Sequence, residues 1–144
     1  MLVRQQVTVE FGFVKDYPST TVNYEGDGET GVTITIEATY GEAKGIRINN
    51  TTRGEYIIIN DDKLSAIVGS GLTRYDKIVI DTTRGNKSAK LLRDGTTKSI
   101  LNAIDLSSKW IQLQKGNNVF TVTTTSGLAN LTISIDYKQE YLGV

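Results

Sequence analysis

The chain has 144 residues, carries 16 basic and 16 acidic side chains for a formal net charge of zero, and contains neither histidine nor cysteine. Balanced charge gives no overall basic field for nucleic acid or an anionic membrane. The missing residue types exclude disulfides, thiolate nucleophiles, Ser-His-Asp and Cys-His catalysis, and the usual zinc ligand. Enzyme chemistry is reduced to a carboxylate pair or a lysine nucleophile.

The length suits one domain, so we expect a single β-sandwich over residues 1–144. The longest apolar runs are far shorter than the roughly 20 residues of a membrane span. The first six residues lack the apolar segment of a secretory signal. We therefore expect a soluble protein that is made in a cytoplasm and does not insert into a membrane.

The N-terminal part predicts two strands. Apolar and polar residues alternate over 7–13, which favours a strand that packs Phe11 and Phe13 inward. Pro18 has no amide hydrogen to donate and ends this strand. Residues 20–24 then resume an extended segment.

Residues 25–31 form the most loop-like segment, with three acids and three glycines. Calcium takes carboxylate and carbonyl oxygens from flexible loops, so a calcium site is one hypothesis. The spacing is not that of an EF-hand loop, and acids with glycines are ordinary turn formers. We favour a turn and predict no metal site.

Regular alternation over 32–39 predicts a strand with one buried face. A second strand is expected around 46–48, and a third over 55–60. Because the third run is rich in isoleucine, it favours a central strand covered on both faces.

The tetrapeptide Thr-Thr-Arg-Gly occurs twice, at Thr51–Gly54 and Thr82–Gly85. A repeated anion or glycan site would require the two arginines to converge in space. The favoured interpretation is that each copy is a loop leaving a strand, with glycine supplying an unusual backbone angle.

Residues 61–72 are ambiguous. Asp61 and Asp62 could cap a short helix that Gly69 ends, but we favour a short strand followed by a loop. The connection that follows is expected to expose Arg74 and Tyr75, which are the candidate contacts for a glycan or a partner protein.

The second half predicts further strands at 77–81, 119–123 and 131–138, the last of these with the clearest two-residue alternation. A helical turn capped by Ser99 is expected over 100–104. Trp110 can stack on a sugar face, but we place it in the core because tryptophan is usually highly buried.

Short motifs in this half follow one another in a familiar order. They are Ile80-Asp81-Thr82, Asp94-Gly95-Thr96, Ser108-Lys109-Trp110, a turn at Lys115-Gly116-Asn117-Asn118, and a closing Tyr141-Leu142-Gly143-Val144. Together with Tyr24-Glu25-Gly26-Asp27 they resemble the C-terminal domain of siphophage-type distal tail proteins. The family turn resembling Pro-Gly-Glu-Asn is replaced here by 115–118.

The resemblance implies an all-β fold, an antiparallel galectin-like or jelly-roll sandwich, in a structural component of a phage or prophage tail. It implies the outer domain, with the N-terminal ring domain of complete family members absent, and a monomer or weak oligomer in isolation. The expected location is the virion tail, where the domain serves as a scaffold or docking surface for the tail tube, the tail-associated protein and the receptor-binding protein.

Two alternatives stay open. One is a carbohydrate-binding domain that recognises host cell-wall or surface glycans through Arg74 and Tyr75. The other is a carboxylate-dependent glycosidase, although the sequence carries no local acid signature for it. We predict a protein that is not an enzyme, with no catalytic residues and no cofactor.

Overall fold

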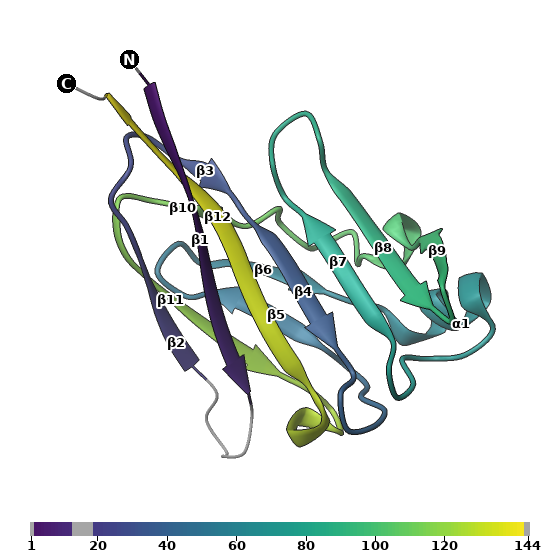
Figure 1. Cartoon of the computed structure of the whole chain (residues 1–144). Coiled ribbons are helices and arrows are strands. Elements are labelled where there is room, and N and C mark those ends of the chain that lie inside the picture. The colour runs from purple at the N-terminus through teal and green to yellow at the C-terminus, as the bar shows by residue number, and fades with distance from the viewer. Residues whose placement is uncertain (1, 13–18, 143–144) are drawn as a thin grey trace.

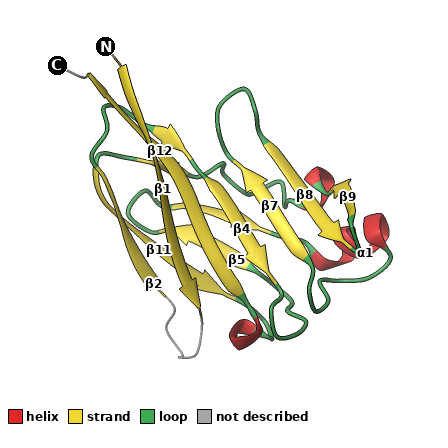
Figure 2. Cartoon of the chain, viewed as in Figure 1, coloured by secondary structure: helices red, strands yellow, loops and turns green. Residues whose placement is uncertain are grey.

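The computed structural model of the protein describes residues 2–12 and 19–142 (Figure 1). Within these residues the chain forms twelve strands, one α-helix and two short 3-10 helices, as Figure 2 shows. All strand pairs are antiparallel, and the two larger sheets pack face to face. The expected all-β sandwich is confirmed. Phe13 and Pro18, at the predicted end of the first strand, lie outside the described residues.

The larger sheet has six strands. Their order across the sheet is β1 (Leu2–Gly12), β12 (Thr132–Leu142), β4 (Thr33–Glu37), β7 (Lys77–Asp81), β8 (Ser88–Arg93) and β9 (Thr96–Ser99). The opposing sheet has four strands, in the order β2 (Ser19–Tyr24), β11 (Gly116–Thr123), β5 (Arg47–Asn50) and β6 (Glu55–Ile58). A two-stranded ladder of β3 (Thr30–Gly31) and β10 (Gln112–Leu113) lies beside them.

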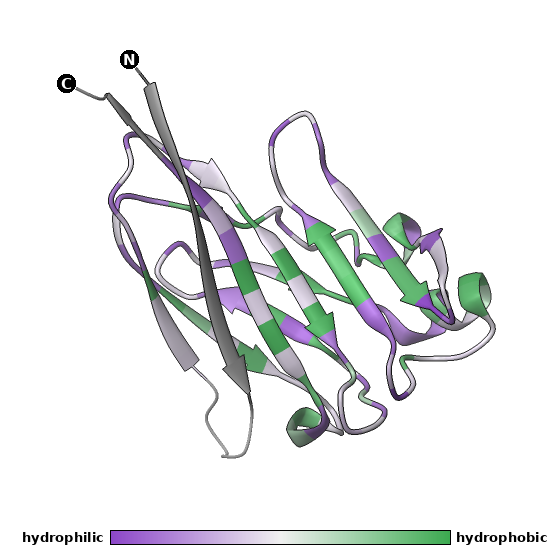
Figure 3. Ribbon diagram, in the orientation of Figure 1, coloured by the Kyte–Doolittle hydropathy of each residue, from purple (hydrophilic) through white to green (hydrophobic). Residues whose placement is uncertain are grey.

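The predicted alternation is confirmed in the strands that cross the core. Side chains at every second position of 32–38 and 131–137 are buried, and those between them are half-exposed. Figure 3 shows this alternation as green and pale bands along β4. The buried rows of both sheets form one apolar cluster, which includes Phe120 and Tyr24.

The first and last strands are paired along their whole length, from Leu2 opposite Leu142 to Gly12 opposite Thr132. The beginning of β1 and the end of β12 therefore lie at the same edge of the sandwich (Figure 1).

The strand predicted after residue 60 is wrong, because Asp61–Val68 form the helix α1. Its N-cap is Asn60, whose side-chain oxygen accepts a hydrogen bond from the Lys63 amide at 3.0 Å. Gly69, with φ of 88°, ends the helix. The Gly69 end agrees with the helical alternative, but the N-cap is Asn60 and not Asp61 or Asp62, which lie in the first turn.

The prediction that 55–60 form a central strand is also wrong, because β6 is the edge of its sheet. The segment 105–109 covers this edge instead. The amides of Asp105 and Lys109 donate to the carbonyls of Ile58 and Tyr56, at 2.9 and 2.8 Å. The Ser108 hydroxyl accepts from the Ile58 amide at 2.9 Å. The backbone groups at the β6 edge are thus hydrogen-bonded by an irregular segment and not by a further strand.

The hairpin between β8 and β9 was not predicted. Asp94 and Gly95 form its two-residue turn, with φ of 50° and 76°. Positive angles at both positions define a type I′ turn, for which Asp-Gly is a preferred pair.

The turn predicted at 115–118 is shifted toward the N-terminus, because β11 already begins at Gly116. The Asn118 amide group donates to the Gln114 carbonyl at 2.8 Å, and the Asn118 side-chain oxygen accepts from the Gln114 amide at 3.0 Å. The asparagine closes the turn from within the strand.

The 3-10 helix η1 (Leu101–Ala103) confirms the helical turn expected over 100–104. Its N-cap is Ile100 with no side-chain cap, so the predicted role of Ser99 is wrong. A second 3-10 helix, η2 (Leu128–Asn130), precedes β12.

Polar side chains buried between the sheets join them. Asn50 of β5 donates to the Gln112 carbonyl at 3.0 Å, and Gln112 donates through its side chain to the Thr82 carbonyl at 2.9 Å. The Thr82 hydroxyl accepts from the Val32 amide at 2.8 Å and donates to the Ile111 carbonyl at 2.7 Å. These bonds fix the end of β7 against the β3–β10 ladder.

Candidate functional site

Arg74 and Tyr75 lie on an exposed loop, as the sequence predicts. Tyr75 is 71% exposed, and the Arg74 guanidinium carbon lies 4.8 Å from the centroid of its ring. The backbone φ of Tyr75 is 74°, a left-handed conformation that is uncommon for a bulky residue. The surrounding structure must therefore hold the ring in its exposed position.

An ion pair between buried Asp76 and partly exposed Arg93 lies next to Tyr75 and supplies that support. Arg93 donates two hydrogen bonds to the Asp76 carboxylate, at 2.9 and 2.6 Å. The same guanidinium donates to the carbonyls of Val68 and Gly71, both at 3.1 Å. Asp76 also accepts from the Thr73 amide at 2.8 Å. This cluster ties the loop to α1 and to β8.

The pKa of Asp76 lies below its ordinary value. Burial of the carboxyl acts to raise the pKa, but hydrogen bonds from Arg93 and Thr73 more than offset that effect. Asp76 is therefore ionised at neutral pH and keeps its bond to Arg93.

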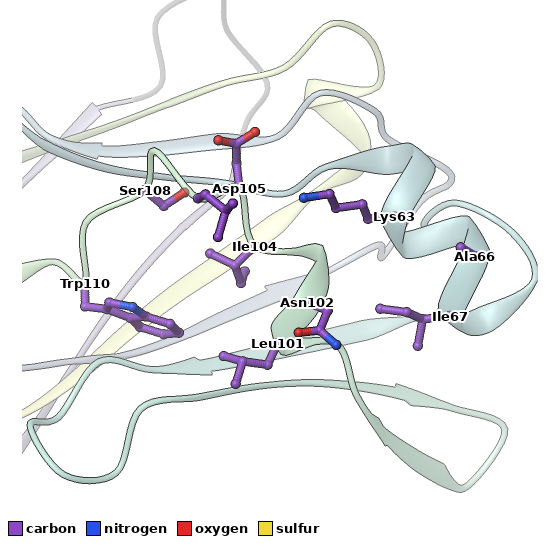
Figure 4. Close-up of a pocket in the computed structure, with 10 residues that line it drawn as sticks. Lys63, Ala66, Ile67, Leu101, Asn102, Ile104, Asp105, Ser108 and Trp110 are labelled. Atoms are coloured by element: carbon purple, nitrogen blue, oxygen red, sulfur yellow. The ribbon is translucent and has the colours of Figure 1, made fainter.

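A groove that the sequence did not reveal opens between α1, η1 and the segment 104–110 (Figure 4). Its volume is about 660 Å³. Its lining residues come from these three parts of the chain: Lys63, Ala66, Ile67, Leu101, Asn102, Ile104, Asp105, Leu106, Ser108 and Trp110. Figure 4 shows Lys63 and Asp105 on one side of the groove, with Leu101 and Trp110 on the other.

Trp110 is neither a fully exposed ring that could stack on a sugar nor a fully enclosed core residue. It packs against the core, as predicted, but it is only partly buried and also lines the groove. The Lys87 ammonium lies 6.0 Å from the ring centroid. The expectation of a tryptophan enclosed in the core is therefore correct for its packing and wrong for its full burial.

The groove carries exposed apolar side chains at its rim. Leu106 is 93% exposed and Leu101 is 44% exposed. Among residues 19–139, the part of the chain whose side-chain exposure is described, only Tyr40 and Tyr75 are other large apolar side chains with such exposure. Two of the four thus lie at one groove.

The carboxylate in the groove is already hydrogen-bonded. Asp105 accepts from the Ser107 amide at 2.9 Å and from the Ser107 hydroxyl at 2.7 Å. These two bonds lower the pKa of Asp105, and the charge of Lys63 adds to the effect. Asp105 therefore stays ionised and faces Lys63.

The arginines of the two Thr-Thr-Arg-Gly copies do converge. Arg53 and Arg84 each contact one oxygen of the Glu29 carboxylate, at 3.1 and 2.9 Å. Arg53 also binds Glu55 at 2.7 Å. Because these carboxylates neutralise both guanidinium groups, the convergence joins two loops and presents no free anion site.

Two acidic side chains of the loop 25–31, which was considered for calcium, form ion pairs with basic residues. Glu29 binds the two arginines, and Asp27 lies 3.9 Å from the Lys115 ammonium. Within residues 2–12 and 19–142, no group of three histidine, cysteine, aspartate or glutamate side chains is placed to hold a metal ion.

Two carboxylates share a smaller cavity of about 370 Å³, lined by Asp81 and Asp136 among others. Both pair across Thr33 of β4, so they are separated by about two strand spacings, or roughly 10 Å. Both are half-exposed, and Asp81 accepts a turn hydrogen bond from the Thr83 amide at 2.9 Å. The cavity gives neither carboxylate the apolar pocket that a general acid needs.

Among the described residues, no helix is long and apolar enough to span a bilayer.

The fold and its exposed features define a class: an antiparallel β-sandwich that presents an aromatic loop and an apolar groove. Residues 25–141 match the family described as siphovirus-type tail component, C-terminal domain. The chain belongs to this family, which confirms the resemblance seen in its motifs. It is a structural component of a phage tail, and its location is the virion tail.

One solved structure shares the fold, and a second gives a weaker match. The crystal structure of the Dit (gp 19.1) protein of phage SPP1, described as a paradigm of the hub adsorption apparatus in phages that infect Gram-positive hosts, matches 96% of this chain with a TM-score of 0.65 and 17% identity. The chain spans 48% of the length of that protein. A chain of the phage P2 baseplate, in its activated conformation with Ca, matches 83% of this chain with a TM-score of 0.46 and 11% identity. The match covers 36% of the length of that baseplate chain. No curated protein matches the chain.

Proposed function

We propose that this chain is one β-sandwich unit that acts as the outer domain of a distal tail protein in the baseplate hub, where it docks other tail proteins. The observation that carries the proposal is the family match over residues 25–141. The fold shared with the SPP1 Dit protein supports it. The rigid attachment of the exposed loops through Asp76 and Arg93 suits a surface that must hold its shape for a partner.

The docking role involves no catalysis. The two carboxylates that share a cavity are half-exposed and lie on strands separated by β4. The chain also lacks histidine and cysteine. These features support a structural role over the glycosidase hypothesis.

Binding to tail proteins tests the proposal. The purified chain is immobilised, and the tail tube, tail-associated and receptor-binding proteins of the same phage or prophage are passed over it in turn. We expect saturable binding to at least one of them. Absence of binding to all three, with each analyte folded by circular dichroism, would contradict the docking role.

The state of the isolated chain is a separate measurement. We propose a monomer or weak oligomer, and light scattering at micromolar concentration checks this. A single sharp hexamer would refute it.

A second candidate function is recognition of a host glycan by the Arg74–Tyr75 loop. The observation that favours it is the tyrosine ring, which is exposed and held in a left-handed backbone conformation. Aromatic rings with free faces stack on sugar rings.

A glycan array and a cell-wall pulldown test this candidate. Tyr75→Gly removes the ring and relieves the backbone strain, so it should fold normally and lose binding. Arg74→Ala should weaken binding, while Arg84→Ala, at another exposed arginine, should leave it unchanged. Binding that survives Tyr75→Gly would place the glycan elsewhere, and absence of binding to every sugar would remove the candidate.

A further inference from the structure

The groove between α1, η1 and segment 104–110 has an apolar floor and rim. Ile67, Ile104 and Trp110 contribute apolar surface, and the exposed leucines 101 and 106 extend it to the rim. A volume of about 660 Å³ lies within the range of clefts that hold a small ligand or a few side chains. It is too small to be the whole of a domain-sized interface.

Positive charge surrounds this apolar surface. Lys63 lines the groove itself, and the Lys98 ammonium donates to the Ile67 carbonyl at 2.7 Å. The Lys87 ammonium lies 6.0 Å from the Trp110 ring. All three lysines are exposed. The one carboxylate that lines the groove, Asp105, is held by Ser107 and balances a single lysine.

We propose that this groove binds a segment of a partner tail protein in which a large apolar side chain is flanked by carboxylates. The apolar side chain would cover Trp110 and the rim leucines, and the carboxylates would meet the lysines. This inference deepens the docking function proposed above by naming the surface and the chemistry of the partner.

The position of the groove supports a docking role. Segment 105–109 is bonded to the edge of β6 through Asp105 and Lys109, and α1 is tied to β8 by the hydrogen bond from Arg93 to the Val68 carbonyl. The groove therefore lies between two elements that the sandwich holds in place, and a partner segment meets a preformed surface.

Trp110 provides the measurement, because it is the only tryptophan in the chain and lines the groove. The probe is a synthetic nine-residue peptide with a central Leu-Phe pair flanked by glutamates. A second peptide has lysines in place of the glutamates. We expect saturable change of Trp110 fluorescence with the glutamate peptide, and affinity about tenfold weaker for the lysine peptide.

Matched variants assign the effect to the groove. Leu106→Ser and Lys63→Ala alter exposed side chains and should fold normally, yet each should weaken the glutamate peptide about tenfold. Tyr40→Ser and Lys115→Ala, at exposed positions that do not line the groove, should leave it unchanged. Equal binding of both peptides, no saturable signal, or a signal given only by cell-wall oligosaccharides would overturn the proposal.

The groove and the docking function can fail separately. If Leu106→Ser still binds the tail proteins as well as the unaltered chain, docking stands and the groove assignment is wrong. If the unaltered chain binds none of them, the docking function itself fails, whatever the peptides show.

Discussion

The two Thr-Thr-Arg-Gly loops have the same sequence but use it in opposite ways. Thr51–Gly54 closes the hairpin between β5 and β6, and Thr82–Gly85 lies in the hairpin between β7 and β8. In the first loop the arginine is the anchored residue, because the side chain of Arg53 is only 18% exposed. In the second loop it is the threonine, because Thr82 is fully buried while Arg84 is 77% exposed.

The difference teaches that a repeated tetrapeptide carries no fixed structural role. Thr51 and Thr82 begin the same motif, but Thr51 donates to the Val119 carbonyl at the surface, whereas Thr82 joins three segments inside the sandwich. Burial, set by the rest of the chain, decides which side chain matters. Four substitution experiments can break or sharpen this comparison.

The largest difference is expected at the first threonine of each copy. Thr82→Val leaves the Val32 amide and the Ile111 carbonyl without their hydroxyl partner, which should lower the free energy of unfolding by about 2–3 kcal/mol. Thr51→Val should change it by less than about 0.5 kcal/mol because Thr51 is exposed. Urea unfolding followed by circular dichroism measures both. Equal losses would show that burial does not separate the copies.

The arginines should show the reverse order. Arg53→Ala removes hydrogen bonds to Glu55 and Glu29 from a largely buried side chain and should destabilise the fold by about 1–2 kcal/mol. Arg84→Ala should lie within about 0.5 kcal/mol of the unaltered chain, because its side chain is exposed. The midpoint of urea unfolding distinguishes them, and a larger loss at Arg84 would contradict the comparison.

The glycines are the positions where the two copies should behave alike. Gly54 and Gly85 have φ of 65° and 84°, and a Cβ at either would meet open space. Only the backbone conformation opposes a side chain, so each Gly→Ala change should destabilise by about 1–2 kcal/mol. Thermal unfolding of the two variants in parallel gives the test. A loss confined to one loop would mean that its backbone differs from the described geometry.

The smallest effect is the coupling between Glu29 and Arg84. A double-mutant cycle with Glu29→Gln and Arg84→Ala should give a coupling energy of about 0.2–0.5 kcal/mol at low salt. The coupling should vanish near about 1 M salt because the pair is exposed. Persistence of the coupling at high salt would indicate that the pair is shielded from solvent.

Much of the fold could be predicted because its strands bury one face. The two-residue period of 32–38 and 131–137 reports directly on the core, and the structure buries those positions. The helix α1 gave no comparable pattern, because Leu64 is its one buried residue. Asn60 and Gly69 at its ends were the better indicators. The Asp94-Gly95 turn was likewise present in the sequence and not used.

The candidate site likewise has one part that the sequence could predict and one part that it could not. Arg74 and Tyr75 could be found because a polar connection between two apolar strands is exposed. The groove could not be found from the sequence, since its residues come from 63–67, 101–102 and 104–110. These parts of the chain meet only because segment 105–109 covers the edge of β6. The convergence of Arg53 and Arg84 on Glu29 also depends on tertiary structure, because no local sequence pattern indicates to which sheet each loop belongs.

The pairing of β1 with β12 has a mechanical consequence. Leu2 lies opposite Leu142, so a force that pulls these two positions apart would load one end of the ladder and open it bond by bond, like a zipper. Such a geometry resists tension poorly compared with strands sheared along their length.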